Sequence, residues 1–126
     1  VGHTGVTEAV KLAIEAVDEG VGRIMAALKQ AHGIMVCSGD HGNSDDMCEV
    51  DKKTGALKRD AEGSFLPKTA HSLNPVPAIV YDPANQSGAR LADVPDAGIA
   101  NLAATCITLL GFEPPEDYTP SLVSFG

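Results

Sequence analysis

The histidines, and the acids beside them, are the residues of this sequence best suited to chemistry. Asp40 and His41 are adjacent in the segment SGDHGN (38–43), which directly follows an apolar run. A carboxylate beside an imidazole offers a divalent metal ion two ligands of mixed type. Gly39 and Gly42 allow the backbone to come close to a bound ion or anion. An Asp-His pair alone is also typical of a turn with a surface histidine, so both interpretations stay open at this motif.

The other three histidines lie in different settings. His3 stands just before a predicted helix, and His71 stands just before a predicted strand. Taken singly, His3 is better explained as an exposed residue near a terminus, and His71 as a loop histidine bonded to backbone. His32 closes the first predicted helix, where a cation is favourable beside the macrodipole, and we assign it no catalytic role.

Other catalytic patterns are weak. Asp45 and Asp46 could act as acid and base, but adjacent acids in a polar loop are more often simply solvated. Ser38 and Ser72 neighbour histidines, yet neither has the strand-turn-helix setting of a nucleophile elbow. The sequence has no Walker loop, no dinucleotide-binding glycine motif and no zinc-finger spacing.

Composition limits the class of protein. The chain has 126 residues, a length typical of one small domain, and its 44% hydrophobic and 21% charged residues indicate a packed core. The formal net charge of -8 argues against nucleic acid or an anionic membrane as a partner. No apolar run approaches the roughly 20 residues of a membrane span. The three cysteines lack Cys-x-x-Cys spacing, which favours reduced thiols and a cytoplasmic location.

Apolar spacing predicts the elements that would position these residues. A stripe at steps of three and four predicts an N-terminal helix that packs on a sheet, with Gly33 as its C-cap. Gly20 and Gly22 within this helix indicate close packing against a neighbour. The stripe consists of Val10, Ile14, Val17, Val21, Ile24 and Leu28.

The strands are predicted from short apolar runs. Ile34–Cys37 is continuous and apolar, which is typical of a strand buried on both faces of a parallel sheet. Pro77–Tyr81 predicts a second strand, and Ala89–Leu91 predicts a short edge strand. Residues 48–59 predict a surface hairpin that turns at Lys53-Thr54-Gly55.

A second amphipathic helix completes the pattern and defines the expected fold class. Asp96 is its candidate N-cap and Gly111 follows its last turn. Its apolar face would comprise Ile99, Leu102, Ala103, Cys106 and Leu110. We expect an α/β fold with three αβα layers around a mostly parallel sheet. Two long strands and two helices are too few for a complete doubly wound fold, so we expect the C-terminal part of a larger sheet.

Three motifs in this order resemble cofactor-independent phosphoglycerate mutases, which belong to the alkaline phosphatase superfamily. The motifs are VGHTG (1–5), SGDHGN (38–43) and TAHSLNPVP (69–77), and the segment LLGFEPPEDY (109–118) resembles the last helix and tail of that family. The resemblance covers essentially the whole chain. It implies that residues 1–126 form the C-terminal part of a metal-binding, phosphatase-like domain, with a partial alkaline-phosphatase-like fold.

The resemblance also implies an activity and a set of ligands. Family members interconvert 3-phosphoglycerate and 2-phosphoglycerate in glycolysis and gluconeogenesis through a phosphoserine intermediate, without 2,3-bisphosphoglycerate. They use two divalent ions, commonly manganese, with cobalt or magnesium as alternatives. By resemblance, His3 and His71 would hold one ion, and Asp40 and His41 would belong to the shell of the second. Two cations would neutralise phosphate charge and lower the pKa of the serine nucleophile.

Departures from the family pattern define what this chain would lack. In the family, an aspartate ligand lies two residues before the position of Val1, and the nucleophilic serine and the substrate domain lie further upstream. We therefore expect a chain that is inactive alone, tends to associate, and depends on the N-terminal remainder of the enzyme as its partner. Two alternatives stay open: another phosphotransferase or phosphohydrolase of the superfamily, such as a phosphopentomutase relative, or a non-catalytic metal-binding remnant.

Overall fold

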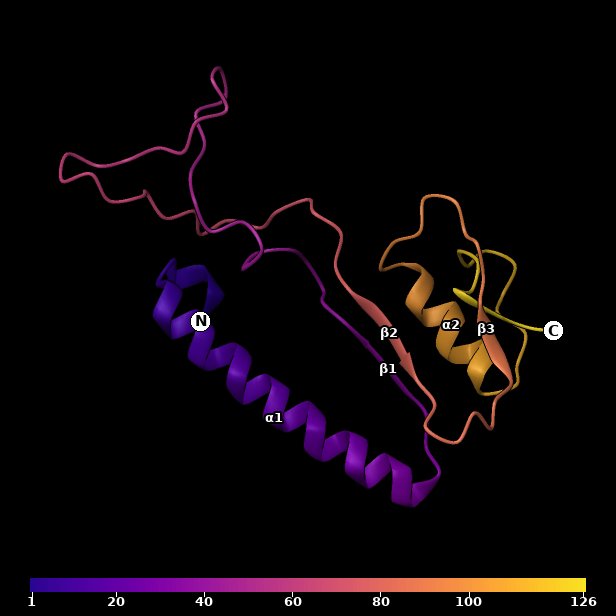
Figure 1. Ribbon diagram of the computed structural model, residues 1–126. Helices are drawn as coiled ribbons and strands as arrows, with labels where there is room; N and C mark the ends of the chain where they lie inside the picture. The colour runs from indigo at the N-terminus through magenta and orange to yellow at the C-terminus, as the bar shows by residue number, and fades with distance from the viewer. The chain divides into compact units, whose positions relative to one another are not determined.

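A long helix, α1 (Thr7–Ala31), begins the computed structural model, which describes residues 1–126 (Figure 1). A single 3-10 turn, Gly2–Thr4, precedes it, and Gly5 separates the two elements with a left-handed φ of 69°. Glu8 lies in the first turn of α1 and Lys29 in the last, where each charge favours the helix dipole. The helix predicted from the apolar stripe is therefore confirmed.

The end of α1 differs from its predicted form. His32 adopts the left-handed conformation, with φ 52°, and the Gly33 amide donates to the Leu28 carbonyl at 2.9 Å. The prediction of Gly33 as the left-handed cap was therefore wrong by one residue. A Cβ at Gly33 would lie 2.5 Å from Leu28 Cδ2, the end of a flexible side chain that would have to move.

The apolar stripe of α1 is largely exposed in this chain. Val10 is buried, but Ile14 and Val17 are 56% and 65% exposed. A Cβ built at Gly20 or Gly22 would meet no atom within 4 Å. The stripe that was predicted to be buried is thus largely exposed, and the predicted close approach at the two glycines is not found.

The chain divides into two compact units, each described by itself. The first, here called the loop unit, comprises Val1–Arg23 and His41–Val76. The second, here called the strand unit, comprises Ile24–Asp40 and Pro77–Gly126. No helix in the structure has the length and apolar character that a membrane span requires.

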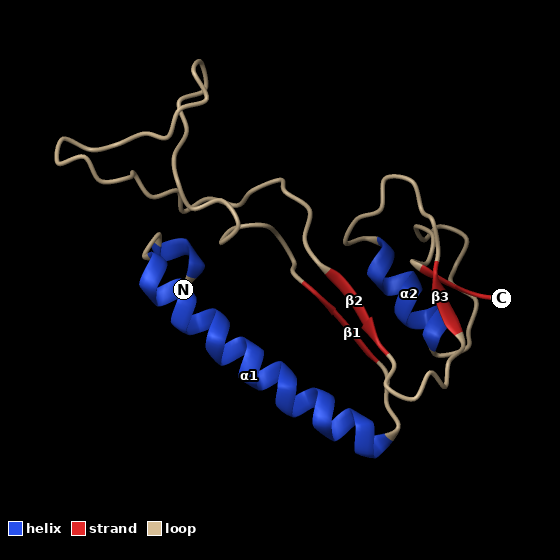
Figure 2. Ribbon diagram, in the orientation of Figure 1, coloured by secondary structure: helices blue, strands red, loops and turns tan.

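Strands β1 (Met35–Ser38) and β2 (Ala78–Tyr81) form the first sheet of the strand unit. They pair antiparallel, with Met35 opposite Tyr81 and Ser38 opposite Ala78. Both strands were predicted, but the parallel direction was not found in this pair. Parallel strands need a crossover, usually a helix, whereas residues 39–77 contain no helix (Figure 2). All four residues of β1 are half-buried rather than buried, and β2 is the only strand paired with it.

The second sheet pairs β3 (Ala89–Leu91) with β4 (Val123–Phe125), again antiparallel. β3 confirms the predicted edge strand, whereas β4 was not predicted. In β4, Val123 is buried and the next two residues are exposed.

Helix α2 (Asn101–Leu109) begins later than predicted. Its N-cap is Ala100, and Asp96 lies outside it with a φ of 53°, so the prediction of Asp96 as the cap was wrong. The Asn101 side chain takes on part of that role by accepting the Gly98 amide at 2.8 Å. At the other end Gly111 is left-handed, with φ 84°, and donates to the Thr108 carbonyl, as predicted for the residue after the last turn.

The buried face of α2 is polar and small rather than apolar. It consists of Asn101, Ala104 and Thr105, and Thr105 is fully buried. The Thr105 hydroxyl accepts a hydrogen bond from the Leu122 backbone amide at 2.8 Å, and the side-chain amide of Asn101 donates to the Pro120 carbonyl at 2.7 Å. These bonds attach the C-terminal segment to the helix. The predicted apolar face is instead exposed, with Ile99 at 52% and Leu110 at 72%.

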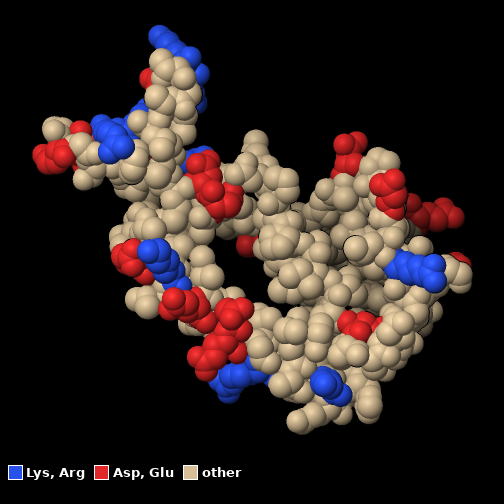
Figure 3. Space-filling view, in the orientation of Figure 1, with Lys and Arg blue, Asp and Glu red and all other residues tan.

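The loop unit contains the predicted surface hairpin. Antiparallel bridges join Val50 to Leu57 and, further along, Cys48 to Pro67, so the hairpin is confirmed. The Asp51 carboxylate accepts the amides of Lys53 and Thr54 at 2.9 Å each, and these bonds, led by the one from Thr54, hold its pKa below the usual range. Figure 3 shows basic side chains as small separate groups among acidic ones on the visible face.

Candidate metal centre

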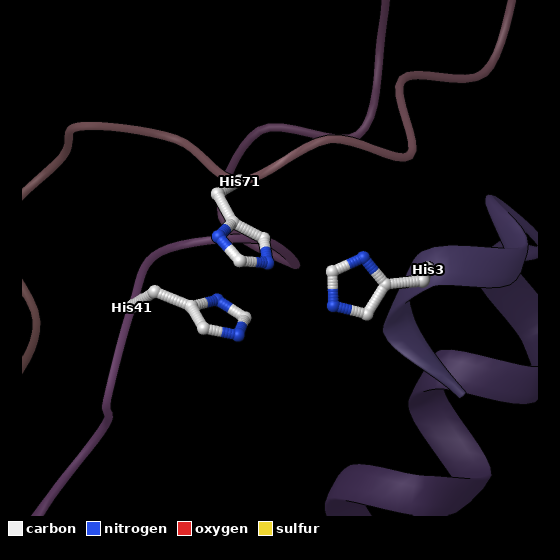
Figure 4. A group of neighbouring side chains, drawn as sticks. All are labelled: His3, His41 and His71. Atoms are coloured by element: carbon white, nitrogen blue, oxygen red, sulfur yellow. The ribbon is translucent and has the colours of Figure 1, made fainter.

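Three histidines from distant parts of the sequence meet in the loop unit. One ring nitrogen from each of His3, His41 and His71 lies within 4.8 Å of the others. Figure 4 shows the three rings gathered around a common space, with His3 beside the helical segment and the other two on loops. His41 is half-buried, and the other two are exposed. Each ring could offer one ligand to a metal ion.

Hydrogen bonds to backbone fix the tautomer of two of these rings. Nδ1 of His3 lies 2.8 Å from the Thr69 carbonyl oxygen, and Nδ1 of His41 lies 3.3 Å from that of Gly42. Because a carbonyl oxygen can only accept, Nδ1 must carry the proton in both bonds. In the neutral ring with this tautomer, the lone pair lies on Nε2. Metal-binding histidines are oriented in this way in proteins, with the second ring nitrogen donating to a carbonyl or carboxylate.

The ring planes show which pairs of histidines could share an ion. His41 and His71 are stacked, with centroids 3.6 Å apart and planes 11° apart. Lone pairs lie in the ring plane, so stacked rings direct them side by side rather than toward one point. His3 is tilted by 52° to His71, with centroids 5.1 Å apart. The pair His3 and His71 is therefore better arranged to converge on one ion than the stacked pair.

The nitrogen spacing is also compatible with metal binding. Bonds of about 2.0–2.1 Å place two imidazole nitrogens on one ion no more than about 4.2 Å apart. The 4.8 Å limit of the cluster is slightly wider. Small rotations of exposed rings would close that difference, so the donor set fits a divalent transition metal.

Close backbone packing holds the two histidine-bearing loops together. The Ser72 amide donates to the Gly42 carbonyl at 2.7 Å. The buried side chain of Asn43 donates to the carbonyls of Thr69 and Ala70 at 3.4 and 3.2 Å. A Cβ at Gly42 would overlap the Ser72 hydroxyl, so only glycine fits there without a shift. The glycine beside His41 thus allows the two loops to touch.

The adjacent acids beside this contact have specific partners. Asp45 accepts hydrogen bonds from the Asn74 amide at 2.5 Å and the Ser72 hydroxyl at 2.9 Å, and both hold its pKa below the usual range. Asp46 forms an ion pair with Lys68 and raises the pKa of that lysine. The expectation that both acids are simply solvated was therefore wrong.

Asp40 occupies a different place in the structure. It belongs to the strand unit, just after β1, where it lines a surface hollow with Ser38, Gly39 and Ala100. His32 lies at the end of α1, where its carbonyl accepts the side-chain amide of Gln86. The structure therefore brings three of the four predicted ligands together in one unit and places Asp40 in the other.

Sequence reasoning missed the residues that support the cluster. Asn43, Ser72 and Asn74 each lie within three residues of a cluster histidine. Their signal was weak, being only short polar side chains beside glycine and histidine. Partners such as Asp45, 27 positions before Ser72, leave no local pattern.

Imidazoles held by backbone carbonyls on glycine-containing loops form a donor set that could hold a metal ion. The sequence profile of the Metalloenzyme superfamily matches residues 1–114, and the chain belongs to that family. The match bears out the expected α/β class of the fold.

Particular relatives give a narrower comparison. The chain is 46% identical to the 2,3-bisphosphoglycerate-independent phosphoglycerate mutase of Trypanosoma brucei brucei and 45% identical to that of Mesembryanthemum crystallinum, over 98% of this chain in each case. A crystal structure of Leishmania mexicana phosphoglycerate mutase at low cobalt concentration superposes with a TM-score of 0.89 at 44% identity, over all of this chain and 23% of that one. The chain spans about 22% of the length of the curated relatives it matches. The resemblance to cofactor-independent phosphoglycerate mutases is confirmed.

Proposed function

We propose that this chain is the C-terminal, metal-binding part of a phosphoglycerate mutase. The complete enzyme would interconvert 3-phosphoglycerate and 2-phosphoglycerate through a phosphoserine intermediate, without 2,3-bisphosphoglycerate. The observation that carries the proposal is the cluster of His3, His41 and His71, which unites the three sequence motifs in one unit. Relatives that bear the name of this enzyme match nearly the whole chain.

Within this function, His3 and His71 would hold one divalent ion, and Asp40 and His41 would belong to the shell of a second. The stacking of His41 on His71 supports placing these two rings on different ions, because stacked rings cannot easily converge on one ion. His3 is tilted to both rings, by 52° to His71 and by 56° to His41, and its centroid lies nearer that of His71. Manganese is the expected metal, with cobalt or magnesium as alternatives. When bound, such ions neutralise phosphate charge and lower the pKa of a nearby hydroxyl.

The hydroxyls of Ser72 and Ser38 both make hydrogen bonds within this chain. The buried Ser72 hydroxyl donates to Asp45 at 2.9 Å, and the Ser38 hydroxyl donates to the Gly39 carbonyl at 2.9 Å. The chain's own part in the reaction would be to bind and orient metal. The N-terminal remainder of the enzyme would supply the serine and the phosphoglycerate site, in a glycolytic enzyme of the cytoplasm.

The test compares the 126-residue chain with the intact natural gene product. Phosphorus NMR would follow 3-phosphoglycerate in the presence of manganese and without 2,3-bisphosphoglycerate. We expect 2-phosphoglycerate from the intact protein and no turnover by the chain alone. Release of inorganic phosphate instead would favour a phosphohydrolase, and turnover by the isolated chain would refute its dependence on the remainder.

Histidine variants of the intact protein provide the matched comparison. His71→Ala should lower turnover by at least about 100-fold, since loss of a single supporting contact at a metal already costs 10- to 100-fold. His32→Ala is the control, because His32 lies at the end of α1 outside the cluster. Equal activity in the two variants would contradict the assignment of His71.

A further inference from the structure

Three hydrogen bonds connect Asp45 with Ser72 and Asn74, two residues that follow His71 closely in the sequence. The Asp45 carboxylate accepts the Ser72 hydroxyl at 2.9 Å and the Asn74 side-chain amide at 2.5 Å, both through Oδ2. The Asn74 backbone amide also approaches the Ser72 hydroxyl, at 3.4 Å. One carboxylate oxygen of Asp45 thus accepts hydrogen bonds from both Ser72 and Asn74.

Ser72 is the buried member of this set, whereas Asp45 and Asn74 are exposed. Ser72 is only 8% exposed, and its amide donates to the Gly42 carbonyl at 2.7 Å. The residue after His71 is therefore attached on its backbone side to the residue after His41, and on its side-chain side to Asp45. A carboxylate acceptor makes the stronger, charge-assisted kind of hydrogen bond.

We propose that Asp45 is a positioning residue that, through Ser72 and Asn74, sets the ring of His71 against that of His41 and thereby sets the affinity of the metal centre. The stacking of these two rings at 3.6 Å is the geometry that the bonds would maintain. The inference rests on the proposed function, since it assigns a role toward the metal that His71 would hold. Asp45 itself does not belong to the histidine cluster.

The alternative role for Asp45 is a general attraction of its charge for cations. Asp45→Asn separates the two roles, because a carboxamide oxygen can still accept from both Ser72 and Asn74 while the negative charge is gone. Asp45→Ala removes both the bonds and the charge. Asp51→Ala is the matched control, because Asp51 also accepts several local hydrogen bonds in the loop unit but belongs to the hairpin turn, away from the His71 segment.

The experiment titrates Co²⁺ into the intact, metal-free gene product and records the visible absorption of the bound ion. Asp45→Ala should raise the dissociation constant about 10- to 100-fold, the usual cost of losing a residue that orients a metal ligand. It should also shift the absorption band, because His71 would meet the ion at a different angle. Asp45→Asn should stay within about threefold of wild type because its hydrogen bonds persist, and Asp51→Ala within about twofold. Ser72→Ala, which removes a single hydroxyl, should weaken binding in the same direction as Asp45→Ala and serves if that variant does not fold.

Each outcome decides a specific claim. Equal losses in Asp45→Asn and Asp45→Ala would overturn the positioning role in favour of charge alone. Unchanged affinity and an unchanged band in folded Asp45→Ala or Ser72→Ala would also overturn it. Tight Co²⁺ binding by a wild-type protein that converts no phosphoglycerate would refute the proposed function, while the variants would still decide the role of Asp45. A wild-type protein that takes up no Co²⁺ would overturn both.

Discussion

A methyl group at position 42 would test how closely the two histidine-bearing loops pack. In Gly42→Ala, the new Cβ would overlap the Ser72 hydroxyl, and it would lie 3.0 Å from an Asp45 carboxylate oxygen and 3.3 Å from the Ser72 carbonyl oxygen. The hydroxyl could turn away only by breaking its bond to Asp45, and the backbone carbonyl could not turn away at all. Overpacking of this kind costs about 1–3 kcal/mol, and a lost hydrogen bond adds about 1 kcal/mol.

We therefore expect Gly42→Ala to lower the free energy of unfolding by about 2–4 kcal/mol, as measured by urea denaturation followed by circular dichroism. Gly20→Ala is the matched control, because a Cβ there meets no atom within 4 Å in the middle of α1. Alanine in a helix interior should stabilise by about 0.5–1 kcal/mol relative to glycine. If Gly42→Ala were as stable as wild type, the described contact between the loops would be wrong.

Three further predictions concern the strand unit and the metal. Thr105→Val should lower the free energy of unfolding by about 1–3 kcal/mol, because it leaves the Leu122 amide without its buried acceptor. Thr105→Ser keeps a hydroxyl acceptor and should therefore retain most of the wild-type stability in the same denaturation assay. Hydrogen bonds, led by that from the Ser87 hydroxyl, hold the pKa of Asp82 below its ordinary value of 3.8. The stabilisation from these bonds is therefore complete above pH 3.8 and is lost as the pH falls through the lower pKa of the folded state. In Asp82→Asn, the free energy of unfolding should depend less on pH in this acidic range. An unchanged dependence on pH would count against the bonds. Chelation with EDTA should lower the melting temperature of the intact protein, and excess manganese should restore it. A melting temperature that changes with neither reagent would contradict metal binding to the folded state.

Local patterns were sufficient to predict most elements but not their pairing. The apolar stripe predicted α1, and short apolar runs predicted β1, β2 and β3. The antiparallel direction of the β1–β2 sheet depends on how residues 39–77 return, and no periodicity reports that path. β4 was missed because the local pattern of Val123–Phe125 does not report its pairing with β3, which lies far earlier in the sequence.

Helix α2 shows why apolar periodicity can select the wrong face. Apolar spacing predicted burial of the side with the largest apolar residues, yet the buried side carries Asn101 and Thr105. These two side chains are buried because they bond the backbone of the C-terminal segment, at Pro120 and Leu122. A hydrogen bond to a distant backbone group gives no signal in hydropathy.

The candidate site was also predicted only in part, because the histidines were found from the sequence and their supporting contacts were not. The resemblance assigned His3 and His71 to one ion and His41 to a second, and the structure places one ring nitrogen of each within 4.8 Å of the others. The supporting contacts, such as Asp45 with Ser72, span 27 residues and depend on the folded path of both loops. They were therefore visible only in three dimensions.

The most direct test of the central claim is metal-dependent conversion of 3-phosphoglycerate by the intact natural gene product. Phosphorus NMR would measure formation of 2-phosphoglycerate after EDTA treatment, and again after manganese is restored, with no 2,3-bisphosphoglycerate present. The account predicts no conversion after chelation and full recovery with the metal. Conversion that survives chelation, or that requires added 2,3-bisphosphoglycerate, would contradict it.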